Sequence, residues 1–355
     1  MKKLPKVYSD LMNIAGISGY EHNVCTYMQV YMQNYQNFTI EKDKLGGVFA
    51  IKKSKNPQAK TLMVAGHLDE IGFIVAEIKD NGLLKIIPIG GINPVVFTAQ
   101  VMNVYLNNQK IIKGIIGVIP PHLQKNPSGL DINNMLLDIG ASSRQDAITH
   151  GVEVGNMVLY DNVFAYTFDN KKVISKAIDN RFGCALALEA IKKFNDVDLD
   201  YHLIIGATVQ EEVGLRGVEI AIKMYNPDFF VALDASPLND TFESNALNKL
   251  EQGFLIRYYD PRNIMHKGLH EYFKKLAQSK KIKYQEYKAM GGTDAAKALT
   301  VNEGRLSTTI GLPARYIHSN AAMFAIADID AARSMLYALL NDLSSTKIAE
   351  LEIAY

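Results

Sequence analysis

Short apolar runs, each followed by polar residues, recur along the chain in the manner of an alternating strand and helix fold. Five of these runs are rich in Val, Ile, Leu and Phe, and they occupy residues 61–67, 173–179, 203–212, 229–234 and 307–318. Such runs are typical of strands that are buried on both faces of a sheet. In an open α/β sheet, ligands bind beyond the carboxyl ends of the strands, so we expect the polar residues that end these runs to meet there.

Helical periodicity appears between these runs in both outer parts of the chain. Leu11, Ile14 and Ala15 share a helical spacing, which predicts a first short helix. Two candidate strands, 38–41 and 48–51, are joined by a Gly46-Gly47 turn. Further helices are predicted at residues 24–32, 182–194, 269–279, 294–299 and 330–343.

The stretch between residues 70 and 165 has a different pattern, with short β-type runs separated by Gly, Pro and Asn and little helical periodicity. Such spacing is typical of a small β barrel or sandwich. We therefore predict one α/β domain, residues 1–69 plus 166–355, interrupted by an all-β, barrel-like insertion at residues 70–165. The runs that carry this prediction are 71–78, 83–87, 100–106, 111–118 and 157–160.

Composition narrows the class of protein. Hydrophobic residues make up 48% of the 355 residues and charged residues 21%, which argues against long disordered segments. Because 38 Lys and Arg balance 37 Asp and Glu, no strong field attracts nucleic acid or an anionic membrane, and we expect neither partner. The N-terminus lacks a signal-peptide pattern and no apolar stretch is long enough to span a membrane, so we expect a cytoplasmic protein. Cys25 and Cys184 are expected to be buried, reduced thiols.

The polar residues that end the five runs form a candidate site for two metal ions. Two divalent ions about 3.5 to 4 Å apart repel each other, so such a site needs several carboxylates. Two histidines add neutral nitrogen ligands, which suit zinc, cobalt or manganese better than magnesium or calcium. The candidate ligands are His67, Asp179, Glu212, Asp234 and His318.

Two further acidic residues have candidate roles beside the metal ions. Asp69 lies two residues after His67, on the same side of an extended chain, where it can orient the imidazole ring. Glu211 and Glu212 are adjacent and diverge, so one can bind metal while the other transfers protons. Helix capping alone explains Asp179, but it does not explain two histidines or a double glutamate.

Five segments of the chain resemble the signature segments of the M42 family of metallo-aminopeptidases, which includes glutamyl aminopeptidases and the TET peptidases. The resemblance covers nearly the whole chain. It implies a mixed sheet flanked by helices, as in other zinc exopeptidases, with an inserted β domain that mediates dimerisation. The segments are Gly66-His-Leu-Asp-Glu-Ile-Gly72, Ile178-Asp-Asn-Arg181, Val209-Gln-Glu-Glu-Val-Gly-Leu-Arg-Gly217, Gly291-Gly-Thr-Asp294 and Ala314-Arg-Tyr-Ile-His-Ser319.

The resemblance also implies roles for the candidate residues and partners for the protein. Asp179 would bridge two divalent ions per subunit, His67 and Asp234 would complete one site, and Glu212 and His318 the other. Glu211 would be the general base in the hydrolysis of peptide substrates. The peptide bond between Asp179 and Asn180 is expected to be cis, and dimers are expected to assemble into a homo-oligomer, a dodecamer.

Substrate preference depends on a different part of the sequence. Residues 254–261 resemble the same segment of lactic-bacterial glutamyl aminopeptidases, and Arg257 could pair with an acidic N-terminal side chain. Arg257 could equally be a structural ion-pair partner in an enzyme of leucyl or broad preference. The chain departs from the family at residues 242–253, where a glycine-rich stretch is usual, and at Asn156, where an Asp is usual.

Two other functions remain open at this stage. A glycosidase could use Glu211 and Glu212, but its carboxyl groups must face each other across a sugar bond, and this function leaves His67 and His318 without a role. A non-catalytic assembly protein could keep the fold without the chemistry. Chelator sensitivity and peptide hydrolysis distinguish these alternatives from a metallo-aminopeptidase.

Overall fold

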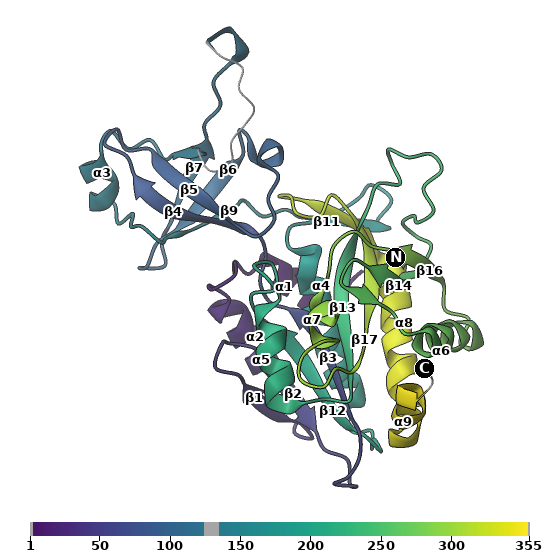
Figure 1. The fold of residues 1–355 in the computed structure, drawn as a ribbon. Helices are drawn as coiled ribbons and strands as arrows, with labels where there is room; N and C mark the ends of the chain where they lie inside the picture. Colours follow the sequence, from purple (N-terminus) through teal and green to yellow (C-terminus); the bar gives the residue numbers. More distant parts are fainter. Residues whose placement is uncertain (1–2, 124–134, 354–355) are drawn as a thin grey trace.

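The computed structural model describes residues 3–123 and 135–353, and it has two parts (Figure 1). One part is a large mixed sheet with helices on both faces. The other is a closed β barrel that is set to one side of the sheet. These observations confirm the predicted fold class.

Four parallel strands form the centre of the large sheet: β12 (His202–Thr208), β3 (Thr61–His67), β13 (Phe229–Leu238) and β17 (Leu306–Arg315). Further strands extend the sheet on both sides. They are β1 (Thr39–Lys42) and β2 (Val48–Lys52) beside β12, β18 (Ala322–Ala325), β11 (Lys172–Ser175) and β10 (Phe164–Tyr166) beyond β17, and β14 (Phe254–Asp260) with β15 (Asn263–Ile264) and β16 (Tyr284–Lys288).

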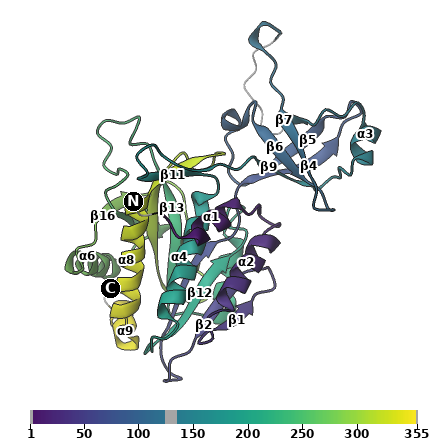
Figure 2. The ribbon, with the colours of Figure 1, turned by 180° about the vertical axis from the view of Figure 1, so that it is seen from behind.

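Helices cover both faces of this sheet, which is why its central strands are apolar throughout. Along β3, Leu62 and Val64 pack into the core on one face, whereas Met63 and Ala65 pack into a separate core on the other. The first face carries α1 (Lys6–Asn13), α2 (His22–Met32), α4 (Ile178–Phe194), α6 (Lys267–Ser279), α8 (Ile326–Asp342) and α9 (Ser345–Ile353), several of which Figure 2 shows in front. The second face carries α5 (Arg216–Tyr225) and α7 (Asp294–Ala298).

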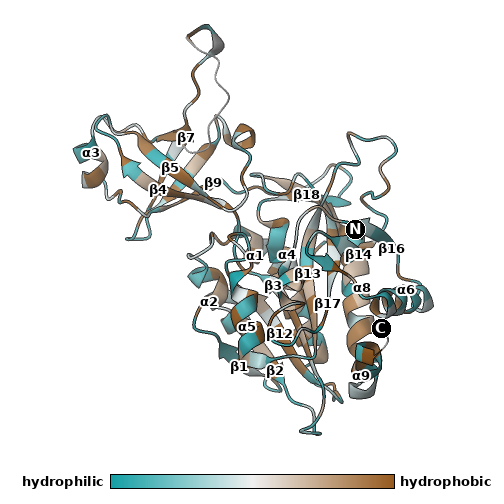
Figure 3. Ribbon diagram, viewed as in Figure 1, coloured by the Kyte–Doolittle hydropathy of each residue, from teal (hydrophilic) through white to brown (hydrophobic). Residues whose placement is uncertain are grey.

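The barrel closes in the strand order β4-β5-β8-β7-β6-β9. Phe97 lies at the centre of its core, in ring contact with both Phe73 and Tyr160. Figure 3 shows that hydrophobic residues concentrate on the strands of both parts. The barrel elements are β4 (Gly72–Ile78), β5 (Leu84–Ile89), η1 (Pro94–Phe97), β6 (Val101–Tyr105), β7 (Ile111–Ile116), η2 (Pro121–Leu123), β8 (Leu136–Asp138), α3 (Arg144–Thr149) and β9 (Met157–Tyr160).

Two details of the predicted strands were wrong. Asp179 does not end a strand: β11 stops at Ser175, the chain turns through Ala177 in the left-handed conformation, and Asp179 lies in the first turn of α4. Asp234 lies inside β13, which continues to Leu238 because it pairs with β17 along its whole length. Among the described helices, none combines the length and hydrophobicity that a membrane span requires.

Candidate metal centre

The candidate ligands converge at one edge of the large sheet. His67 ends β3, Glu211 and Glu212 follow β12, and His318 follows β17, so the parallel direction of these strands places their carboxyl ends together. Each of three overlapping groups offers ligand atoms that lie within 4.8 Å of one another. The groups are His67 with Glu211 and Glu212, His67 with Asp179 and Asp234, and Asp179 with Glu212 and His318.

Asp179 lies between the two histidines. Its Oδ1 is 3.1 Å from Nε2 of His67, and its Oδ2 is 3.5 Å from Nε2 of His318. Asp234 Oδ1 lies 3.7 Å from His67 Nε2, and Glu212 Oε2 lies 3.6 Å from His318 Nε2. These five side chains therefore form two half-sites that share the carboxylate of Asp179.

This cluster holds more negative charge than its protein partners balance. Within the described residues, Asp179, Glu211, Glu212 and Asp234 form ion pairs with histidine but with no lysine or arginine. Burial, together with neighbouring carboxylates, raises the pKa of Asp234 and Glu211 well above the usual range and that of Glu212 to about 8. A buried set of carboxylates and imidazoles with these properties fits divalent cations.

Asp69 contacts both the histidine and the glutamate pair. His67 Nδ1 lies 3.1 Å from the Asp69 carbonyl oxygen and 3.4 Å from Asp69 Oδ1. The carboxylate of Asp69 accepts hydrogen bonds from the backbone N–H groups of Glu211 (3.0 Å) and Glu212 (3.1 Å) and from the hydroxyl of Ser18 (2.7 Å). Asp69 thus fixes the loop after β12 relative to the end of β3, which sequence spacing did not predict.

Arg181 connects the segments of the chain that carry His67 and Asp179. Its side chain is fully buried and donates to the backbone carbonyl oxygens of Leu68 (2.6 Å), Leu11 (2.8 Å), Ile14 (2.7 Å) and Gly16 (3.0 Å). The Leu68 carbonyl lies between His67 and Asp69 in the chain, and Arg181 itself follows Asp179 by two residues. Arg181 therefore ties two ligand-bearing segments together. In the sequence, the only sign of this role is that Arg181 belongs to a signature segment.

Two buried ion pairs of Glu70 support this arrangement. Glu70 Oε1 lies 2.6 Å from Lys176 Nζ and 3.3 Å from Arg181 Nη2, and all three side chains are buried. Burial lowers the pKa of Lys176 to about 8. Glu70 lies two residues before β4, so these ion pairs also fix the barrel's first strand beside the candidate metal centre.

Non-glycine residues in the left-handed backbone conformation surround the ligands. They are Ala177, Gln210, Tyr316 and His318, with φ between 50° and 61°. Such conformations are uncommon and concentrate at functional sites. The peptide bond between Asp179 and Asn180 is cis, as the resemblance implied.

A cavity of about 380 Å³ opens beside the carboxylates and includes Arg257. The guanidinium of Arg257 is largely buried; its Nη1 donates to Ser236 Oγ (3.4 Å), its Nη2 donates to the Gly291 carbonyl, and its Nε lies 3.5 Å from Asp260 Oδ2. The cavity is lined by Asp179, Glu211, Glu212, Asp234, Ala235, Pro237, Arg257, Ala289, Met290, Gly291, Gly292, Thr293, Ile317 and His318.

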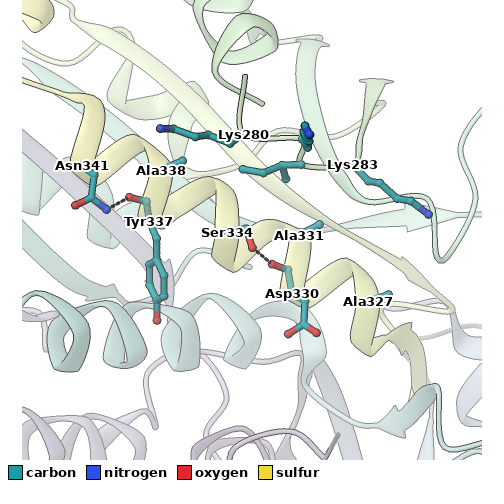
Figure 4. Close-up of a pocket in the computed structure, with 11 residues that line it drawn as sticks. Lys280, Lys283, Ala327, Asp330, Ala331, Ser334, Tyr337, Ala338 and Asn341 are labelled. Atoms are coloured by element: carbon teal, nitrogen blue, oxygen red, sulfur yellow. Dashed lines mark hydrogen bonds between the residues drawn. The ribbon is translucent and has the colours of Figure 1, made fainter. Parts of the chain in front are cut away.

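A wider groove of about 580 Å³ lies elsewhere, between α8 and the turn that follows α6 (Figure 4). Small residues of α8 such as Ala331 and Ala338 form its floor, and Lys280, Lys281 and Lys283 border it. It includes none of the candidate ligands, so size alone does not identify the site.

Comparison with known proteins identifies the same family that the signature segments resemble. The model of the family described as M42 glutamyl aminopeptidase matches residues 46–335. The glutamyl aminopeptidase of Lactococcus lactis subsp. cremoris is 38% identical over 346 residues, which cover 96% of this chain and 97% of the relative.

Solved structures resemble the whole fold. The crystal structure of a TET aminopeptidase from a marine sediment archaeon, Thaumarchaeota archaeon SCGC AB-539-E09, has a TM-score of 0.92 and 30% identity, with 98% of both chains covered. The TET1 peptidase of Pyrococcus horikoshii, described as able to assemble into a tetrahedron or a large octahedral shell, has a TM-score of 0.85 and 27% identity, with 95% of this chain and 99% of that chain covered.

Proposed function

The chain belongs to the M42 aminopeptidase family, and on that premise we propose that it removes the N-terminal residue of peptides with the help of two divalent metal ions, with a preference for Glu and Asp. The observation that carries the proposal is Asp179, whose two carboxylate oxygens face His67 and His318 at 3.1 and 3.5 Å. A carboxylate in this position is suited to bridging two cations.

The residues that would hold the ions form two sets that share Asp179. His67 and Asp234 complete one set, and Glu212 and His318 the other. Mixed imidazole and carboxylate ligands favour zinc, cobalt or manganese over magnesium and calcium. When bound, such ions would supply Lewis acidity and lower the pKa of a coordinated water to about 7.

Glu211 is the residue that we assign to proton transfer. Its Oε2 lies 3.8 Å from His67 Nε2, so it faces the same space as the candidate ligands. Glu211 takes a proton from the attacking water as the oxygen bonds to the scissile carbonyl carbon. It then passes that proton to the amine nitrogen as the C–N bond breaks. Asp69 positions Glu211 by accepting its backbone N–H.

The acidic preference rests on Arg257. A guanidinium has five N–H bonds. In Arg257 two of them donate to described residues and Nε faces Asp260 Oδ2 at 3.5 Å, so N–H bonds of Nη1 and Nη2 remain for a carboxylate ligand. Its place in the wall of the cavity that holds Glu211 and Asp234 supports contact with the side chain of an N-terminal residue. The name of the Lactococcus relative points to the same preference.

The barrel has a separate role in this proposal. We assign residues 1–69 plus 166–355 to the catalytic domain and residues 70–165 to dimerisation, with dimers assembling into a homo-oligomer, a dodecamer. Ile111 and Ile115 support this assignment, because they lie on either side of Lys113 on one face of β7 and are 51% and 46% exposed on the barrel surface. Exposed apolar residues on one face of a strand are suited to contact with a second copy.

A panel of aminoacyl-nitroanilides tests the function. The protein is stripped of metal by a chelator and then assayed with zinc, cobalt or manganese on glutamyl, aspartyl and leucyl substrates. We expect no activity without metal, and faster hydrolysis of the two acidic substrates with it. Activity that survives chelation would overturn the metal-dependent mechanism, and faster hydrolysis of the leucyl substrate would remove the acidic preference.

The variant Arg257→Met tests the substrate preference separately from the hydrolysis reaction. It should lower kcat/KM for the glutamyl substrate by about tenfold or more, because a lost charged hydrogen bond costs roughly 1.5 to 3 kcal/mol. The leucyl substrate makes no such bond and should be hydrolysed at least as well as by the unmodified enzyme. An equal loss on both substrates would mean that Arg257 has only a structural role.

A further inference from the structure

The segment Gly291-Gly-Thr-Asp294 is a signature segment to which the proposed chemistry gives no role. It connects β16 to α7, and its first three residues line the cavity beside the carboxylates and Arg257. Met290, which precedes it, is 81% exposed although it lines the same cavity, so this segment runs from the cavity's mouth into its wall.

The second half of the segment is firmly anchored. Thr293 and Asp294 are buried, and the hydroxyl of Thr293 lies 2.9 Å from the hydroxyl of Thr309 on β17. The carboxylate of Asp294 contacts the hydroxyl of Thr208 at the end of β12. These contacts hold the segment in place from two central strands of the sheet, so the position of its first half is well defined.

The two glycines are not required by the backbone or by internal packing. Neither Gly291 nor Gly292 has a φ in the left-handed region. A Cβ atom on Gly291 would meet no atom within 4 Å, and one on Gly292 would meet Ala296 and Arg262 at an ordinary 3.6 Å. Alanine would reduce the conformational entropy of the unfolded chain, so glycine at both positions has a small stability cost. The space beside them is therefore left free for a molecule other than the protein itself.

The backbone polar groups of the glycines match a carboxylate ligand. The N–H groups of Gly291 and Gly292 donate no hydrogen bond to any residue that the structure describes. The Gly291 carbonyl accepts from Arg257, which brings the guanidinium against this segment. Unpaired N–H donors next to a guanidinium are suited to a negatively charged side chain.

We propose that Gly291 and Gly292 form the wall of the pocket that receives the side chain of the substrate's N-terminal residue, and that the absence of side chains there sets the length accepted. This inference rests on the proposed aminopeptidase function. A glutamyl side chain is one methylene longer than an aspartyl side chain, so it needs the space that the glycines leave. Added carbon atoms at Gly291 therefore select against the longer substrate.

Kinetics of Gly291→Ala and Gly292→Ala test this assignment. We expect each substitution to lower kcat/KM for glutamyl-nitroanilide by about tenfold and for aspartyl-nitroanilide by less than about threefold, because a methylene group in a tight pocket changes discrimination by about 10- to 200-fold. Gly117→Ala is the matched control, since a Cβ there would also meet only ordinary contacts, at 3.7 Å, in the barrel. The control should leave the ratio of the two substrates unchanged.

The outcomes separate the pocket wall from the wider function. If the unmodified enzyme hydrolyses acidic substrates and neither variant changes the glutamyl-to-aspartyl ratio, the wall assignment is wrong while the proposed function stands. If the unmodified enzyme prefers leucyl substrates, the acidic preference fails, and the wall is tested by the leucyl-to-alanyl ratio, which both variants should lower. An unchanged ratio in that case also overturns the wall. Thermal unfolding of each variant establishes that the fold is retained.

Discussion

The metal centre and the barrel bury their interiors in different ways. At the sheet edge, charged side chains such as Asp69, Glu70 and Arg181 are fully buried and joined by hydrogen bonds. Among the described residues from the start of β4 to the end of β9, the buried polar side chains are only Asn103 and Asn156, and the other buried side chains are hydrophobic. Burial of a charge is costly unless it is paired, so a fold retains it where chemistry needs it. This difference agrees with our proposal that the chemistry takes place at the sheet edge and that the barrel contacts other copies.

The largest effect is expected for Glu211→Gln. The amide keeps the size of the side chain but cannot accept and return a proton, so kcat should fall by about 10²- to 10⁴-fold. The hydrogen bond from the residue 211 backbone to Asp69 remains, and metal content should stay unchanged. Single-turnover assays and metal analysis of the purified variant measure both quantities.

A control in the other region sharpens this test. Glu153 lies in the barrel and pairs with Asn107, so Glu153→Gln makes the same chemical change away from the sheet edge. It should leave kcat unchanged. Full turnover in Glu211→Gln would show that another group transfers the proton.

The next largest effect is expected for Arg181→Lys. Lysine keeps the charge near Glu70, but its three donors at a single nitrogen cannot reach the carbonyls of Leu68, Leu11 and Gly16 together. Because the Leu68 carbonyl belongs to the segment that carries His67, the metal ligands lose their fixed positions. Metal affinity should fall by about 10- to 100-fold, as for other groups that position ligands.

Titration with zinc distinguishes this role from a general loss of stability. At saturating metal, Arg181→Lys should regain most of the activity of the unmodified enzyme. The exposed Arg216, changed to Lys, provides a control with unchanged affinity. An Arg181→Lys variant with normal zinc affinity and a lower melting temperature would assign Arg181 to folding alone.

A smaller effect on metal affinity is expected from pH, because two candidate ligands carry protons when no metal is bound. Burial raises the pKa of Glu212 to about 8, and the contact with Asp179 raises the pKa of His318 to about 10 against the lowering effect of burial. Both groups are therefore protonated at pH 7, and a metal ion must displace these protons. Metal affinity should fall as the pH falls, by about tenfold per pH unit for each proton released.

Calorimetry in buffers of different ionisation enthalpy counts those protons. We expect a net release when zinc binds at pH 7 and a smaller release at pH 9, where Glu212 is already ionised. Affinity that is independent of pH between 6 and 8 would contradict the prediction. The described barrel strands contain no comparable buried acid. Proton release on addition of zinc should therefore vanish in a variant that lacks the sheet-edge ligands.

The sequence predicted the sheet and the convergence of the ligands because both depend on local patterns. Strands such as β3 are buried on both faces and read as continuous apolar runs, and parallel strands bring His67 and Glu212 to one edge. Strands β14 to β16 were not predicted: Arg257 interrupts the apolar run of β14, and β15 has only two residues. Helix α5 was also not predicted, although Val218, Ala221 and Ile222 share a helical spacing.

Contacts between distant residues explain what the sequence could not predict. The hydrogen bonds from Arg181 to Leu11 and from Ser18 to Asp69 join residues far apart in the chain, and no spacing in the sequence indicates them. The turns that aim the ligands use Ala177 and His318 in the left-handed conformation. Residues other than glycine seldom adopt it, so the sequence gives no sign of these turns.

The smallest effect on chemistry is expected for a change on the barrel surface. Ile115→Glu places a charge on the exposed face of β7, where it should prevent contact with a second copy, and light scattering should detect smaller particles. Because all candidate ligands and Glu211 come from one chain, kcat/KM should change by less than about threefold. Val154→Glu, at a barrel residue that is 66% exposed, provides the control and should leave the particle size unchanged. If Ile115→Glu abolished turnover while metal stayed bound, the separation of chemistry from assembly would fail, because the active site would then depend on the neighbouring subunit.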